Sequence, residues 1–184
     1  LDIVDKVYLN GKDMNQYPIA CKNDNHFRFL GPNYKVVDDI GGDLIEVNGL
    51  MGAGVDPHLY KASEGDVTKL FQADIIFYNG LHLEGKLVEV FEKMGSNKMT
   101  ISLGESLDRN ELIGSEYFAS NYDPHVWFNI TYFKQFANKV TSVLSEKDSK
   151  NKVNYIENEK KYLAKLDVLQ RNIKALTELL PAEK

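Results

Sequence analysis

Hydrophobic and polar positions along the chain follow two alternating patterns. Short apolar runs, rich in branched residues, predict strands at 44–51, 74–78 and 99–103. Longer stretches carry apolar residues three or four positions apart and predict helices at about 34–40, around 67–71, and at 81–94, 129–146 and 153–180. Strands that alternate with helices indicate an α/β fold, in which helices flank a parallel sheet on both faces.

The chain before residue 34 has a less regular pattern. An Asn10-Gly11 turn signal between short apolar runs predicts a hairpin or an arm. The apolar run at 17–21 predicts a first strand. The stretch 23–33 is expected to be irregular, with a solvated His26.

The last predicted helix, 153–180, is the longest. Its length of about 28 residues corresponds to roughly 40 Å at the α-helical rise, and Pro181 ends it. A stripe of this regularity normally packs against another part of a protein. The stripe consists of Val153, Ile156, Leu163, Leu166, Leu169, Ile173, Leu176 and Leu180.

A five-residue pattern occurs twice: Asp-Pro-His, then an aliphatic residue, then an aromatic one. It spans Asp56–Tyr60 and Asp123–Trp127 and contains two of the four histidines. Proline fixes its own φ and keeps the preceding residue extended, so each histidine sits on a stiff turn. Both turns follow predicted strands, whose carboxyl ends share one edge of a parallel sheet. We therefore expect His58 and His125 to share one divalent metal ion, with ring nitrogens about 3–4 Å apart. The simpler alternative is two unrelated turns with surface histidines.

Two histidines alone do not complete a metal site, because zinc usually takes four ligands and manganese takes more oxygen ligands. The candidates for further ligands are Asp56, Asp66, Glu84, Glu105 and Asp123. Asp56 and Asp123 each lie two residues before a histidine, which favours orienting the imidazole or forming an Asx turn. Tyr60 and Trp127 are expected to form aromatic walls beside the turns, and His82 to be structural.

Composition narrows the classes of function. The net charge of -5 and the lack of a basic block argue against a nucleic-acid partner. No apolar run approaches 18 residues, the length that predicts a membrane-spanning helix. A single cysteine, Cys21, excludes an internal disulfide and a cysteine-based zinc site. The sequence also lacks a phosphate-binding loop, a His-Glu-x-x-His motif and a nucleophile elbow.

Three classes of function are compatible with these residues. The histidines could capture a divalent metal ion for transport. They could also hold the metal of a hydrolase, which would need a general base and an open coordination position as well. The third class is an interaction or adhesin module in which both turns are merely structural. Metal-dependent hydrolysis would favour the second class, and folding with no metal response would favour the third.

Three segments, in the same order, resemble the metal-specific solute-binding proteins of bacterial ABC transporters, the manganese, zinc and iron group. They are 49–60, which ends in the first Asp-Pro-His pattern, 73–85, which contains Gly-Leu-His-Leu-Glu, and 123–128, which contains the second pattern. The resemblance extends from about Tyr34 to Pro181. Several long motifs in the right order make this a specific resemblance.

The resemblance implies a receptor of two α/β lobes joined by one long rigid helix, with the metal in the cleft between them. Residues 34–150 would be the amino-terminal lobe and 151–184 the connecting helix, preceded by a segment of strand and irregular structure at 1–33. His58 and His125 match the two metal-binding histidines of the first lobe. The second lobe, which supplies a His or Glu and a carboxylate, is expected to be absent.

For function, the resemblance implies capture of Mn²⁺, Zn²⁺ or Fe²⁺ as the transported ligand and its delivery to the membrane permease of an ABC importer, without enzymatic activity. It also implies a location in the periplasm or on the cell surface, with a lipid anchor in the full-length protein. The chain departs from the family at Asn129, where Asp is common. Zinc-specialised members often have a histidine-rich loop; its absence, with Leu50-Met51-Gly52 and Gly-Leu-His-Leu-Glu, favours manganese.

Overall fold

The computed structural model describes residues 34–51, 54–94 and 98–179 and three short strands nearer the amino terminus. The first two of these, β1 (Tyr8–Leu9) and β2 (Lys12–Asp13), pair antiparallel with Leu9 opposite Lys12. This pairing agrees with the hairpin that the Asn10-Gly11 signal allowed. The strand expected at 17–21 lies outside the described residues.

A four-stranded parallel sheet forms the centre of the fold, with the order β4-β3-β5-β6. Three of its strands are those predicted from the apolar runs: β4 (Glu46–Gly49), β5 (Ile75–Tyr78) and β6 (Met99–Ser102). Ile75, Ile76 and Phe77 are all fully buried, as expected for a strand covered on both faces.

The fourth strand corrects the sequence analysis. The stretch 23–33 was expected to be irregular, but its residues His26–Phe29 form β3, which pairs with both β4 and β5 in the interior of the sheet. The prediction was wrong because His26 and Arg28 interrupt the two phenylalanines. Interior parallel strands are usually recognised by a continuous apolar run, and β3 has none.

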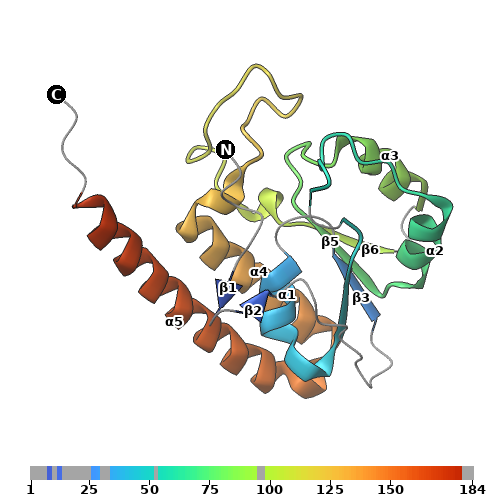
Figure 1. The fold of residues 1–184 in the computed structure, drawn as a ribbon. Coiled ribbons are helices and arrows are strands. Elements are labelled where there is room, and N and C mark those ends of the chain that lie inside the picture. Colours follow the sequence, from blue (N-terminus) through green and yellow to red (C-terminus); the bar gives the residue numbers. More distant parts are fainter. Residues whose placement is uncertain are drawn as a thin grey trace.

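Helices cover both faces of the sheet (Figure 1). One face carries α2 and α3, which pack on Ile76; the other carries α1, α4 and α5, whose core includes Ile75 and Phe77. The helices are α1 (Tyr34–Gly41), α2 (Glu64–Gln72), α3 (Gly85–Met94), α4 (Ile130–Lys147) and α5 (Lys152–Thr177). Short 3₁₀ turns are η2 (Gly42–Leu44), η4 (Gly104–Ser106), η5 (Val126–Phe128) and η6 (Ser149–Asn151).

The starts of the helices follow local capping chemistry. Ser63 and Asp66 form a capping box at the start of α2, each accepting the backbone N–H of the other. Asn129 caps α4 by accepting the N–H of Thr131 at 2.8 Å. The predicted start of α3 was wrong: the helix begins at Gly85 and not at Leu81, because Leu81 has a positive φ that ends regular structure there.

Helix α5 packs on the rest of the fold as far as Gln170, whose side chain accepts a hydrogen bond from Lys134 at 3.1 Å. Tyr155, Tyr162 and Leu166 are buried against α1 and α4, and Lys134 of α4 pairs with Asp167 at 2.7 Å. Beyond this pair, Figure 1 shows the helix extending away from the lobe. The predicted stripe continues there but is exposed at Leu169, Ile173 and Leu176.

The segment between η4 and η5 is a loop. Leu107 and Leu112 anchor it in the core, whereas the adjacent Ile113 is 72% exposed. Hydrophobicity alone does not determine which of two adjacent loop residues points inward. Across the part of the chain that the structure describes, no helix combines the length and apolar character needed to span a membrane.

Candidate metal centre

Both Asp-Pro-His turns lie at the carboxyl edge of the sheet. The first follows β4 and leads to α2, and the second follows β6 and its loop and leads through η5 to α4. The chain places β4 on one side of β3 and β5 on the other, so the direction of winding reverses beside β3. Open α/β sheets bind ligands at such a reversal, outside the carboxyl ends of the strands.

The two histidines come together at this edge although 67 positions separate them. Their Nε2 atoms are 3.4 Å apart, and their ring centroids are 5.3 Å apart. Two nitrogen ligands about 2.1 Å from one ion are themselves about 3.4 Å apart when the angle at the ion is tetrahedral. The spacing of His58 and His125 is therefore compatible with two ligands of one ion, as the sequence analysis expected.

Asp123 orients the His125 ring from the side opposite Nε2. Its Oδ1 lies 2.6 Å from Nδ1 of His125 and accepts the His125 backbone N–H at 2.9 Å. Because an ionised carboxylate only accepts hydrogen bonds, Nδ1 carries a proton, and in the neutral ring Nε2 is then the nitrogen with the free lone pair. Burial acts to raise the pKa of Asp123, but these bonds and the nearby imidazoles hold that pKa below its ordinary value.

Asp56 forms an Asx turn in the first motif. Its Oδ1 accepts the His58 backbone N–H at 2.8 Å, the same local bond that Asp123 makes in the second motif. Among the described residues, however, it makes no hydrogen bond to the ring of its histidine. The sequence left two roles open for these aspartates, orienting the imidazole and forming an Asx turn. Asp123 has both roles, whereas Asp56 only forms the turn.

The other three carboxylate candidates do not join the histidine pair. Asp66 belongs to the capping box and accepts the Tyr60 hydroxyl at 2.8 Å. Glu105 pairs with Arg109 at 2.6 Å. Glu84 is 1% exposed and accepts backbone N–H groups, and its burial raises its pKa to about 7. Within the described ranges, no group of three or more His, Cys, Asp or Glu side chains could hold a metal ion.

Aromatic rings surround the two imidazoles. Phe118 stacks on His58, with centroids 5.8 Å apart, and meets His125 edge-on at 5.7 Å. Trp127 packs edge-on against His125 at 5.1 Å, which agrees with the expected aromatic wall. Tyr60, expected as the second wall, packs with the core beneath α2. Sequence reasoning missed Phe118, because it lies in a loop without a regular pattern.

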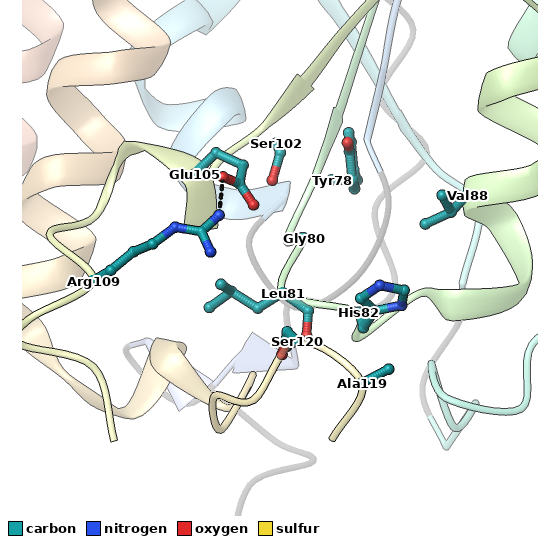
Figure 2. Close-up of a pocket in the computed structure, with 10 residues that line it drawn as sticks. All are labelled: Tyr78, Gly80, Leu81, His82, Val88, Ser102, Glu105, Arg109, Ala119 and Ser120. Atoms are coloured by element: carbon teal, nitrogen blue, oxygen red, sulfur yellow. Dashed lines mark hydrogen bonds and ion pairs between the residues drawn. The ribbon is translucent and has the colours of Figure 1, made fainter. Parts of the chain in front are cut away.

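A cavity of about 390 Å³ adjoins the turn after β5 (Figure 2). Tyr78 and Ser102 line it from the ends of β5 and β6, and the Glu105–Arg109 ion pair lies at its side. His82 also lines this cavity, whereas His58 and His125 do not. The structure therefore does not bring the third described histidine side chain into the site.

Fold and site together define a class of protein: an α/β fold that presents two imidazole nitrogens at the carboxyl edge of a parallel sheet. Comparison with known families makes the assignment more specific. Residues 30–184 match the model of the family described as zinc-uptake complex component A, periplasmic, and the chain belongs to this family. It is a family of ABC-transporter substrate-binding proteins and not of enzymes, which confirms the resemblance found in the sequence.

Individual relatives agree with this assignment. The chain is 39% identical over 134 residues to the manganese-binding lipoprotein MntA of Bacillus subtilis, covering 73% of this chain and 44% of MntA. It is 37% identical over 183 residues to the manganese ABC transporter substrate-binding lipoprotein PsaA of Streptococcus mitis, covering 90% of this chain and 59% of PsaA. The chain thus spans about half the length of these relatives.

A solved structure supports the fold. The periplasmic zinc-binding protein TroA of Treponema pallidum superposes with a TM-score of 0.80 at 32% identity, covering 85% of this chain and 56% of TroA. The names of these relatives describe lipoproteins and a periplasmic protein, and they mention manganese in two cases and zinc in one.

Proposed function

We propose that His58 and His125 bind a divalent transition-metal ion, which the protein captures outside the cytoplasm for delivery to an ABC importer. The observation that carries the proposal is the 3.4 Å distance between their Nε2 atoms, combined with the Asp123 carboxylate on Nδ1 of His125. Carboxylates that fix the tautomer of a ligating imidazole are typical of protein metal sites.

The metal ion is cargo in this proposal. Membership of a family of substrate-binding proteins supports capture and delivery, with the membrane permease of the importer as the partner. The lipoprotein and periplasmic relatives support a location in the periplasm or at the cell surface, with a lipid anchor in the full-length protein. A metal-dependent hydrolase is not supported, because the family does not consist of enzymes.

For the complete receptor we favour manganese over zinc and iron, on the names of MntA and PsaA. The chain alone should behave differently. With two imidazole ligands, the remaining coordination positions are left to water or buffer ions. Imidazole sites follow the general order in which zinc binds more tightly than manganese. We therefore expect weak binding with a preference for Zn²⁺ over Mn²⁺.

Titration calorimetry with Zn²⁺ alone tests the site. Substitution of a residue that hydrogen-bonds to a metal ligand typically lowers metal affinity roughly 10–100-fold. His58→Ala and His125→Ala remove a ligand itself, so each should lower the Zn²⁺ affinity by more than this. His82→Ala is the matched control, since His82 is exposed and lies outside the pair, and it should bind as the wild type does. Unchanged affinity in either of the first two variants would show that the pair is not the site.

The fold should not depend on the metal. Its two apolar cores contain no metal ligand, unlike a zinc finger, whose folding energy comes from the ion. Circular dichroism with and without a chelator should therefore give the same helical signal. A loss of helical signal on chelation would contradict this and would indicate a structural metal.

A further inference from the structure

The turn that follows β5, Asn79–Glu84, has an unusual backbone. Gly80, Leu81 and His82 have φ values of 81°, 53° and 60°, so three consecutive residues adopt the left-handed conformation. Two of them carry a Cβ atom, for which this conformation is uncommon. Such backbone persists only where the surrounding structure over-determines it, and it is found preferentially at functional sites.

Buried contacts hold the turn in this shape. The Glu84 carboxylate accepts the N–H of Asn79 at 2.8 Å and that of Gly80 at 3.1 Å. Position 80 also requires glycine, because a Cβ there would lie 1.9 Å from Ser102 Oγ. The turn is therefore a fixed element at the carboxyl end of β5.

Two hydrogen bonds connect this turn to the segment that carries Phe118 and His125. The Asn79 side-chain amide, which is fully buried, donates to the Pro124 carbonyl at 3.0 Å. The Ser120 hydroxyl donates to the Leu81 carbonyl at 3.0 Å, and Figure 2 shows Ser120 beside Leu81. The first bond reaches the residue directly before His125.

We propose that Asn79 is a positioning residue of the metal site, which holds His125 opposite His58 through the Pro124 carbonyl. The peptide group between Pro124 and His125 is planar, and it is bonded at both ends. Its C=O accepts from Asn79, and its N–H donates to Asp123. Because Asn79 is buried, water cannot replace its bond without a structural change. This inference rests on the proposed function of the histidine pair.

The variant Asn79→Ser tests the proposal, since serine is too short to reach the Pro124 carbonyl. Titration with Zn²⁺ alone should show an affinity about tenfold lower than that of the wild type. In the metal-free protein, long-range ¹H–¹⁵N spectra of the imidazoles should show a mixture of tautomers for His125. The signals of His58 should stay as they are. A purely structural role would not separate the two rings in this way.

Asn158→Ser is the matched control. Asn158 also donates its side-chain amide to a backbone carbonyl, that of Ile40, at 3.0 Å, but it joins α5 to α1. This variant should keep the wild-type Zn²⁺ affinity and His125 signals. Equal losses of affinity in both variants would overturn the proposal, and so would wild-type affinity in Asn79→Ser.

If Asn79→Ser does not fold, Ser120→Ala removes the second connection at a half-buried position. It should weaken Zn²⁺ binding in the same direction and to a smaller extent, and wild-type affinity would then overturn the proposal. Failure of the proposed function is a separate outcome, in which His58→Ala and His125→Ala bind Zn²⁺ as the wild type does. The spectra of the metal-free protein would still decide whether Asn79 positions His125.

Discussion

The two Asp-Pro-His turns have the same sequence pattern but are held by the fold in different ways. In both, the aspartate accepts the backbone N–H of the histidine, at 2.8 Å in the first turn and 2.9 Å in the second. The residues after the histidines differ: Leu59 is 64% exposed, whereas Val126 is 4% exposed. Among the residues that the structure describes, a buried amide on the proline carbonyl and a carboxylate on the imidazole ring are found in the second turn and not in the first.

The comparison separates what a motif determines from what its surroundings determine. The local pattern fixes the turn, because proline and the Asx bond act within a few residues. The rigidity of the turn comes from distant residues, which the pattern does not include. We therefore expect His125 to set the position of a bound ion, and His58, on the exposed turn, to adjust to it.

The largest effect should come from Glu84, the buried acid of the turn that connects β5 to the Pro124 carbonyl through Asn79. Its pKa is about 7 in the folded protein, against 4.5 in the unfolded chain. Between these values the folded state binds more protons, so the free energy of unfolding falls as pH rises from about 4.5 to about 7. Ionisation of Glu84 should lower the free energy of unfolding by up to about 3 kcal/mol, and this decrease should be complete above pH 7.

Urea unfolding at pH 5 and pH 8 measures this effect. The free energy of unfolding of the wild type should fall between the two pH values. In Glu84→Gln this fall should be smaller by up to about 3 kcal/mol, because glutamine does not ionise. Glu105→Gln removes an exposed carboxylate of the same region and is the matched control. An identical pH dependence of Glu84→Gln and the wild type would show that Glu84 ionises normally in the folded protein.

A matched pair of truncations tests the difference in packing between the turns. Val126→Ala removes buried methyl groups and should lower the free energy of unfolding by about 1–3 kcal/mol. Leu59→Ala, at the equivalent position of the first turn, should change it by no more than about 0.5 kcal/mol. Similar losses in the two variants, measured by urea unfolding, would mean that the first turn is packed as firmly as the second.

Sequence reasoning predicted the elements whose patterns are local. Periodicity identified the strands β4, β5 and β6 and the helices on both faces of the sheet. It failed at β3, where Arg28 interrupts the apolar run of an interior strand. It also failed at 81–84, because the left-handed turn is imposed by the buried Glu84 and not by a local propensity.

The same limit applies to the site. The repeated motif was sufficient to predict that His58 and His125 approach one another. It could not distinguish Asp56 from Asp123, since the same Pro-His pair follows both. Nor could it find Phe118 or Asn79, which reach the histidines or their turn from other parts of the fold. Contacts of this kind depend on the tertiary arrangement.

The two aspartates offer the finest test of the comparison. Substitution by asparagine keeps an oxygen that can accept the backbone N–H, so both Asx turns should survive. At position 123, however, the change removes the negative charge that faces Nδ1 of His125. We expect Asp123→Asn to lower the Zn²⁺ affinity by about tenfold, the smaller end of the range for groups that orient a metal ligand. Titration calorimetry with Zn²⁺ measures it.

Asp56→Asn should change the Zn²⁺ affinity by less than about twofold, because Asp56 makes only the turn bond that asparagine can also make. Each variant loses one negative charge from an Asp-Pro-His turn, so the change in net charge is the same in both and cancels from the comparison. An equal loss in both would attribute the effect to general electrostatic attraction of the cation. A loss confined to Asp123→Asn would attribute it to the orientation of the His125 ring.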